Sequence, residues 1–362
     1  MWVNLSSDDD GSFHDDGRLV TTALVCPDKF RGTLTAVEAA AAMARGPHAA
    51  GFDDVVQLPL ADGGEGTLDA LLASRGGSHR QATVTGPLGD PVVAEWGVLT
   101  GGTAVVEMAT ASGLALMITD VDPLRASTRG TGELIAAAIR SGAREVIVGV
   151  GGSATTDGGL AALEVLGWTL GRTKVSVACD VSTRFLDAAK VFAPQKGASE
   201  AQVALLARRL ARLAEEYERR TGVDVREIPG GGAAGGLAGG LAAIGAQLEP
   251  GFDVVAGAVG LEDAFEDVEL VVTGEGRLDA ASFEGKVVGG VLEWAGDAGV
   301  PHCVVIAGQA TREARDELGV RVHAQLLALT DRVWQSGEAF ARAAELVEEA
   351  AIEAGRTVLG TA

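Results

Sequence analysis

The chain has 362 residues, of which 47% are apolar and 4% aromatic, and it contains 51 glycines. This length is enough for two domains with buried cores. A core built mainly from Ala, Val and Leu, with frequent glycines, favours an α/β fold over a β-sandwich. The net charge of −21 would repel nucleic acids and anionic membranes, so we expect neither as a partner.

The three cysteines indicate a reducing compartment. Cys26, Cys179 and Cys303 lie in or at the end of apolar, strand-like segments, and no pair has the spacing of a metal site. Their odd number predicts reduced thiols and a cytoplasmic protein. No apolar run reaches the ~20 residues needed to span a bilayer. Residues 1–18 lack the segments of a signal peptide, and we expect a disordered acidic tail there.

The first elements alternate between strand and helix. Residues 21–28 (TTALVCPD) predict a buried strand. Thr35 and Glu38 have the spacing of a capping box that begins a helix, and Gly46-Pro47 predicts its end. A second strand (DVVQLPLA) and a second helix (TLDALLASRG) follow. This order predicts parallel strands.

The pattern changes after residue 77. QATVTGPLGDPVVAEWGVLTGGTAVVEMA alternates and contains two turn signals, which predicts an antiparallel meander. Helices and strands then alternate again. Ser199 and Gln202 predict the cap of a long helix, and the glycine- and alanine-rich segment 230–245 predicts a helix packed tightly through small residues.

The last part of the chain repeats the rhythm of the first. VELVVTGEG, PHCVVIAGQ and RVHAQLLAL predict three strands separated by helices. Since the middle differs, we predict a discontinuous domain over residues 19–76 plus 266–362, with a second, mixed α/β domain over 77–265 inserted into it.

Clusters of glycine and acidic residues follow the predicted strands. They are CPDKFRG (26–32), ADGGEG (61–66), GGSATTDGG (151–159), ACD (178–180) and TGEGRLD (273–279). Ligands of open parallel sheets bind beyond the carboxyl ends of the strands. Glycines there let backbone N–H groups approach a phosphate, and carboxylates can hold Mg²⁺ or accept a hydroxyl proton. An acidic residue at a helix N-terminus also stabilises the helix without a ligand, but the five clusters together favour a phosphate site. Lys196 in PQKG and Lys286 in EGK would neutralise phosphate there, although each alone is typical of a surface lysine.

Two common nucleotide-binding motifs are absent or incomplete in this sequence. The chain has no GxxxxGK[ST] sequence and is therefore not a P-loop NTPase by motif. GVGGSA (149–154) matches GxGxxG/A, but the acidic residue expected ~20 positions later is absent. An NAD-dependent oxidoreductase is thus a distant alternative.

Eight segments in order resemble the type I glycerate kinases. They are CPDKFRGTLTA, PLADGGEGT, STRGTGELI, GGSATTDGG, ACDV, FAPQKGA, GGGAAGGL and TGEGRLD, within residues 21–310. The resemblance implies a kinase that uses ATP and Mg²⁺ to phosphorylate D-glycerate, giving 2-phosphoglycerate or 3-phosphoglycerate. It also implies two α/β domains, one of them flavodoxin-like with a parallel sheet, and an active site in the cleft between them.

The resemblance also suggests roles for the clustered residues. Asp180 and Asp157 are alternative candidates for the base that accepts the hydroxyl proton, and Lys196 and Lys29 are the other candidate catalytic residues. Asp62 and Asp180 are candidate ligands of Mg²⁺. The candidate residues for binding substrate or phosphate are Arg31, Asp62, Gly63, Gly64, Glu65, Gly66, Ser153, Thr155, Gly274, Glu275, Asp279 and Lys286.

The sequence departs from the family at two places. The loop at 181–191 is shorter and lacks the usual Asn-Pro-Leu, and Ala281-Ser282 replaces a Gln-Thr pair. If these loops line the substrate pocket, the preferred acceptor would shift. A relative that acts on another small hydroxyacid, or that serves as a binding sensor, therefore remains an alternative, although the retained acids argue against a sensor. The small-residue helices permit a homodimer.

Overall fold

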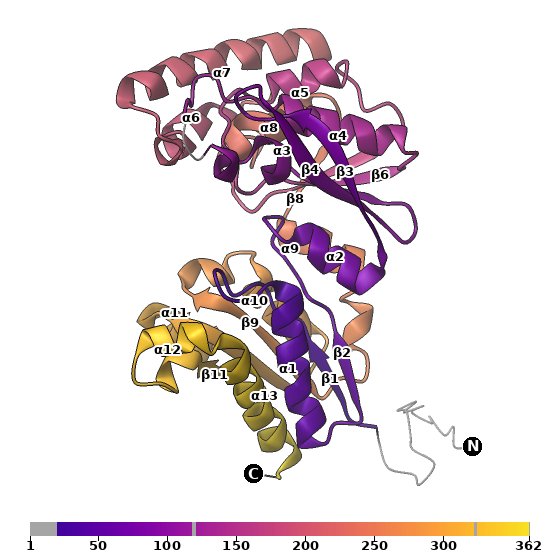
Figure 1. Ribbon diagram of the computed structural model, residues 1–362, viewed down its shortest axis with the longest axis vertical. Helices are drawn as coiled ribbons and strands as arrows, with labels where there is room; N and C mark the ends of the chain where they lie inside the picture. The colour runs from indigo at the N-terminus through magenta and orange to yellow at the C-terminus, as the bar shows by residue number, and fades with distance from the viewer. Residues whose placement is uncertain (1–19, 118–120, 322–323, 362) are drawn as a thin grey trace, which may run out of the picture. The chain divides into compact units, whose positions relative to one another are not determined.

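The computed structural model describes residues 20–117, 121–321 and 324–361 (Figure 1). The chain forms two compact units. Unit 1 contains the residues up to Leu58, Gly260–Ala280 and the residues from Val291 onward, and unit 2 contains Pro59–Val259 and Ala281–Gly290. The predicted tail at 1–18 lies outside the described residues. In the described part of the chain, no helix has the length and apolar character needed to cross a membrane.

Unit 1 is built on a five-stranded parallel sheet with the order β11-β10-β9-β1-β2. Its strands are β1 (Thr22–Val25), β2 (Asp54–Gln57), β9 (Leu270–Leu278), β10 (His302–Ala310) and β11 (Ala324–Ala328). Numbered along the chain, these strands have the 2-1-3-4-5 order of flavodoxin-like sheets. The predicted flavodoxin-like fold is therefore confirmed, and it follows from the apolar strands β1, β9 and β10, which are largely buried on both faces.

The helices of unit 1 include a pair, α1 and α13, that lie side by side (Figure 1). The helices whose described residues lie in this unit, wholly or in part, are α1 (Ala36–Ala50), α10 (Val287–Asp297), α11 (Arg312–Arg321), α12 (Ser336–Ala341) and α13 (Ala343–Leu359). The predicted capping box is confirmed, because the Thr35 hydroxyl accepts from the Glu38 N–H and the Glu38 carboxylate accepts from the Thr35 N–H. These two bonds satisfy N–H groups that a helix start leaves unpaired.

The predicted end of α1 at Gly46-Pro47 is wrong. The helix continues through Pro47 to Ala50 and ends at Gly51, which has φ +107°. Gly46 serves packing instead, since a Cβ on it would lie 2.3 Å from the carbonyl carbon of Ala351 in α13. The close contact between the two helices outweighs the single backbone hydrogen bond that a proline removes.

Unit 2 is built on a six-stranded mixed sheet with the order β3-β4-β5-β6-β7-β8. Its strands are β3 (Gly77–Thr85), β4 (Pro91–Leu99), β5 (Ala104–Glu107), β6 (Glu145–Gly149), β7 (Lys174–Ala178) and β8 (Gln247–Glu249). The first three pair antiparallel, which confirms the predicted meander, and β5 to β8 pair parallel. The carboxyl ends of β5, β6 and β7 therefore lie at one edge.

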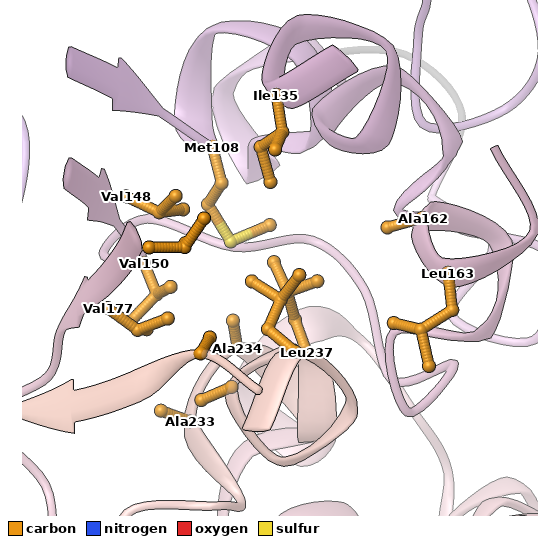
Figure 2. Packing of buried hydrophobic residues seen from close by; sticks show 14 of the residues in the cluster. Met108, Ile135, Val148, Val150, Ala162, Leu163, Val177, Ala233, Ala234 and Leu237 are labelled. Carbon is orange, nitrogen blue, oxygen red and sulfur yellow. The ribbon is translucent and has the colours of Figure 1, made fainter. Parts of the chain in front are cut away.

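The helices of unit 2 cover this sheet and form its core. They are α2 (Thr67–Arg75), α3 (Ala109–Ser112), α4 (Arg129–Arg140), α5 (Leu160–Val165), α6 (Ala188–Phe192), α7 (Glu200–Thr221), α8 (Ala233–Ala243) and α9 (Gly251–Val259). The Ser199 and Gln202 capping box of α7 is confirmed. Helix α8 confirms the predicted packing through small residues, because a Cβ on Gly240 would lie 2.6 Å from the Gly158 carbonyl oxygen. Leu237 of this helix and Met108 after β5 point toward one another in the core (Figure 2).

The limits of the two compact units differ from those predicted for the two domains. The domain limits themselves stay a prediction. Residues 59–76, assigned by sequence to the discontinuous domain, lie in unit 2, as do residues 281–290. Helix α2 packs against β4, β5 and α9, all of which belong to unit 2. The glycine–acid segment at 61–66 therefore belongs with the mixed sheet.

Candidate active site

The segment 61–66 (ADGGEG) lies against the carboxyl ends of β6 and β7. A Cβ on Gly63, which has φ +81°, would lie 2.6 Å from the Cβ of Ala178 at the end of β7. A Cβ on Gly149, the last residue of β6, would lie 2.6 Å from the Gly63 carbonyl oxygen. Such distances exclude any side chain at either position unless the backbone moves. The glycines thus allow the loop to approach both strand ends.

Carboxylates fix both ends of this loop. The Asp62 Oδ1 accepts a hydrogen bond from the Gly64 N–H at 3.2 Å. Glu107, the last residue of β5, is 8% exposed, and its Oε1 accepts from the Leu68 N–H at 2.9 Å in the first turn of α2. Glu65 is exposed between these anchors. The loop is therefore held at its start and at the helix that follows it.

Asp180 follows β7 and contacts the first residue of α9. The exposed Asp180 side chain accepts a 2.7 Å hydrogen bond from the Gly251 N–H through Oδ1. A Cβ on Gly251 would lie 2.0 Å from the Asp62 carbonyl oxygen and 2.8 Å from the Asp180 Oδ1. The backbone of Asp62 and the carboxylate of Asp180 therefore meet at Gly251.

Lys196 is a buried cation beside the loop that follows β6. Lys196 is the last residue of the short 3-10 turn Pro194–Lys196, and it is 2% exposed. The ammonium group donates to the Ser153 Oγ at 2.8 Å and to the Thr155 carbonyl oxygen at 2.6 Å. Burial lowers the pKa of Lys196 to about 8, and the nearby charge of Asp157 opposes this lowering. Lys196 therefore titrates close to neutral pH.

Asp157 connects the starts of two helices. Its carboxylate accepts from the Thr128 N–H at 2.9 Å, from the Thr128 hydroxyl at 2.8 Å and from the Gly159 N–H at 3.1 Å. Thr128 precedes α4, and Gly159 precedes α5. Burial raises the pKa of Asp157, and the hydrogen bonds from Thr128 and Gly159 oppose that rise. Three donors on one carboxylate are typical of a residue that positions its neighbours.

The other predicted residues fall into both units. Lys286 lies in unit 2, in the turn before α10, and its carbonyl oxygen accepts from the Gly290 N–H. In unit 1 the structure brings the remaining candidates together at the carboxyl ends of β1 and β9. Two backbone hydrogen bonds join these strand ends: the Asp28 N–H donates to the Gly274 carbonyl oxygen at 2.9 Å, and the Gly276 N–H donates to the Lys29 carbonyl oxygen at 3.4 Å. The candidates there are Lys29, Arg31, Gly274, Glu275 and Asp279.

Three residues of the unit 2 site were not predicted from the sequence. Thr128 holds Asp157, Glu107 holds the start of α2, and Gly251 holds Asp180. An isolated acid at the end of the apolar strand AVVE is a signal that would have indicated Glu107. Nothing near Gly251 in the sequence indicates its role, because β7 and α9 are far apart in the chain.

The structure argues against a dinucleotide site at GVGGSA. The motif follows β6, but α5 begins only at Leu160, after a long loop. The dinucleotide motif requires its glycines to open the helix that binds the pyrophosphate.

The carboxylates fit the chemistry of Mg²⁺. In the described ranges, no group of three or more His, Cys, Asp and Glu side chains is placed to hold a metal ion. Mg²⁺ in phosphoryl-transfer sites, however, needs only one or two carboxylates together with phosphate oxygens and water. The Asp180 carboxylate lies at Gly251 beside the backbone of Asp62, and each of these two residues can supply a carboxylate oxygen of that kind.

Comparisons with known proteins agree on one family. The model of the glycerate kinase family matches residues 23–174 and 168–359. Glycerate 2-kinase of Escherichia coli K12 is 41% identical over 335 residues, which cover 82% of this chain and 86% of that protein. Glycerate kinase of Bacillus subtilis 168 is 37% identical over 369 residues, covering 91% and 95% respectively. A crystal structure from Salmonella typhimurium LT2, provisionally named glycerate kinase 2, has a TM-score of 0.82 and 33% identity and covers 94% of this chain and 99% of that chain.

Proposed function

Because the chain belongs to the glycerate kinase family, we propose that it transfers the γ-phosphate of ATP to glycerate, giving phosphoglycerate and ADP. The O2 hydroxyl of D-glycerate is the proposed acceptor, in line with the name of the Escherichia coli relative. The observation that carries this proposal is the buried ammonium of Lys196 beside Ser153, at the strand edge that also holds Asp62 and Asp180.

Lys196 and Ser153 are the proposed phosphate-binding pair. Phosphoryl transfer needs mainly positioning and neutralisation of charge on the transferred group. The Ser153 Oγ accepts a hydrogen bond from Lys196, so its own proton can be donated to a phosphate oxygen. The burial of Lys196 makes its charge more effective than the same charge would be in water.

Asp180 is the proposed base. A glycerate hydroxyl has a high pKa, so a carboxylate accepts its proton only as the transition state develops. The exposed Asp180 is accessible to a substrate, whereas Asp157 accepts three hydrogen bonds from Thr128 and Gly159. Asp157 is therefore proposed to position the loop that carries Ser153.

Asp62 is the proposed ligand of Mg²⁺, with Asp180 as an alternative ligand. When bound, the ion would neutralise charge on the phosphates of ATP. Asp180→Asn separates the two roles of that residue: loss of a base lowers kcat at saturating Mg²⁺, whereas loss of a ligand raises the Mg²⁺ concentration required for half-maximal activity.

A cytoplasmic location is part of the proposal. Cys26, Cys179 and Cys303 are free thiols, and the first and last of them are buried. Burial raises the pKa of Cys303 to about 11, which keeps this thiol protonated and unreactive at neutral pH. Reduced thiols of this kind are typical of a reducing compartment.

The test measures ADP formation from Mg·ATP with D-glycerate, L-glycerate, D-lactate and 3-hydroxypropionate. D-lactate carries only the C2 hydroxyl and 3-hydroxypropionate only the C3 hydroxyl, so the pair reports which position is used. We expect turnover with D-glycerate, and some with D-lactate. ADP formation with D-glycerate no faster than without an acceptor would refute the proposal.

A matched pair of variants tests the role of Lys196. Lys196→Met removes the buried charge, and Lys190→Met removes an exposed lysine from α6 in the same unit. We expect kcat/KM to fall about 100-fold or more in the first variant, since it loses a charge that binds the transferred group, and to stay within about twofold in the second. Equal activity of both variants would exclude Lys196 from the phosphate site.

A further inference from the structure

Unit 1 contains a cavity of about 460 Å³ at the carboxyl end of its parallel sheet. The cavity is lined by β9 and β10, by the segments that follow β1 and β11, and by the segment that includes α12. The residues that the argument uses are Phe30, Arg31, Gly276, Arg277, Gln309 and Phe340. All of them belong to unit 1.

The cavity lies where the strand order reverses. β1 has β9 on one side and β2 on the other, so the chain leaves β1 toward one edge of the sheet and leaves β9 toward the opposite edge. Such a reversal opens a crevice beyond the carboxyl ends of the two strands. In flavodoxin, whose sheet has this order, the crevice holds a mononucleotide.

Glycines bring the strand ends close together beneath this crevice. A Cβ on Gly276 would lie 2.8 Å from the Arg31 nitrogen, and a Cβ on Gly308 would lie 2.4 Å from the Gly276 carbonyl oxygen. The floor is therefore backbone rather than side chain. A ligand can approach peptide groups there, as phosphate groups do in other glycine-rich sites.

The walls combine positive charge with an aromatic ring. Arg31 and Arg277 are exposed at the cavity, and Arg277 has the Asp279 carboxylate at 3.8 Å. Phe340 is 59% exposed, and a Cβ on Gly32 would lie 3.0 Å from its Cζ, so the ring stands against the turn that carries Arg31. Guanidinium groups suit phosphates, and an exposed ring suits a planar base.

The volume of the cavity indicates which of the two substrates of the proposed reaction binds there. A three-carbon acid would leave most of 460 Å³ empty. Cavities of this size fit ligands as large as a nucleotide. We propose that this cavity binds the nucleotide, with its base against Phe340 and its phosphates toward Arg31 and Arg277. The identification of the nucleotide as ATP rests on the proposed function.

Matched variants test the cavity through ADP affinity, measured by calorimetry without glycerate. Phe340→Ala and Arg277→Ala change the lining. Trp334→Ala and Arg312→Ala remove another exposed ring and another exposed cation from the same unit, outside the cavity. We expect Kd for ADP to rise about 10-fold or more in the first two variants, since stacking and charge-assisted contacts are worth that much. We expect changes within about twofold in the controls and in KM for glycerate.

Photolabelling with 8-azido-ADP locates the base directly. Labelled peptides that contain Gln309 or Phe340 would support the proposal. Labelling confined to peptides of unit 2, or unchanged Kd in both cavity variants, would overturn it, and so would a wild-type protein that binds no ADP. A protein that binds ADP here but does not turn over glycerate would instead refute the proposed function and leave the cavity assignment standing.

Discussion

Replacing Lys196 by methionine should reduce activity strongly without destabilising the protein to the same degree. Methionine has a similar length and no charge, so the site stays filled. Lys196 is 2% exposed, and its two acceptors are the Ser153 hydroxyl and the Thr155 carbonyl oxygen. The variant therefore removes both the energetic cost of burying the charge and the benefit of the two hydrogen bonds.

The magnitude follows from the pKa of the lysine. The lowering from 10.5 to about 8 corresponds to about 3 kcal/mol by which burial disfavours the charged form at neutral pH. The variant recovers this cost and leaves two acceptors without their donor, at about 1–3 kcal/mol each. We expect the free energy of unfolding at pH 7 to change by an amount between a gain of about 1 kcal/mol and a loss of about 3 kcal/mol. A loss above about 4 kcal/mol would show that Lys196 is retained for stability.

The same lysine predicts a pH dependence with a definite sign. Below pH 8 Lys196 is protonated in both the folded and the unfolded chain, so its contribution is constant. Between pH 8 and 10.5 the unfolded chain holds the proton and the folded one does not, so the stability of the wild type rises relative to Lys196→Met by about 3 kcal/mol. Urea unfolding of both proteins at pH 7 to 10.5 measures this difference. A flat difference would refute the burial of a charged lysine.

Three further substitutions separate the roles proposed for the acidic residues. Asp180→Asn should lower kcat about 10²- to 10⁴-fold in steady-state assays with little change in melting temperature, because the residue is exposed; normal kcat would exclude it as the base. Gly251→Ala should lower activity and should lower the free energy of unfolding in urea by about 1–3 kcal/mol, because the added Cβ would lie 2.0 Å from the Asp62 carbonyl oxygen. A variant with unchanged stability and activity would contradict this contact. Asp157→Asn should cost about 1–3 kcal/mol of stability through weaker bonds from Thr128 but less kcat than Asp180→Asn; the reverse order would reassign the base.

Local signals in the sequence were sufficient for much of the fold. The capping boxes at Thr35 and Ser199 depend on residues three positions apart, and both are present. The alternation of residues 78–107 predicted the meander, because each strand has one face toward the core. Gly46 was misread, since a glycine that ends a helix and a glycine that lets two helices touch have the same sequence signal.

The candidate site was only partly predictable for the same physical reason. The sequence indicated Lys196 and Ser153 as separate candidates, but their contact depends on the fold that brings positions 153 and 196 together. The burial that lowers the pKa of Lys196 is likewise a property of the folded core. Gly251 acts through two long-range contacts, with Asp62 and Asp180, and no local pattern reports such contacts.

The central claim is that this chain phosphorylates D-glycerate at O2. Phosphorus NMR of a reaction with Mg·ATP and D-glycerate tests it most directly, because one spectrum follows the loss of the ATP γ-phosphate and identifies the phosphate ester that forms. The account predicts that the γ-phosphate signal is replaced by that of 2-phosphoglycerate, and that Lys196→Met leaves it unchanged over the same time. Formation of 3-phosphoglycerate would contradict the position assigned to the acceptor, and an unchanged ATP spectrum with the wild-type protein would contradict the kinase itself.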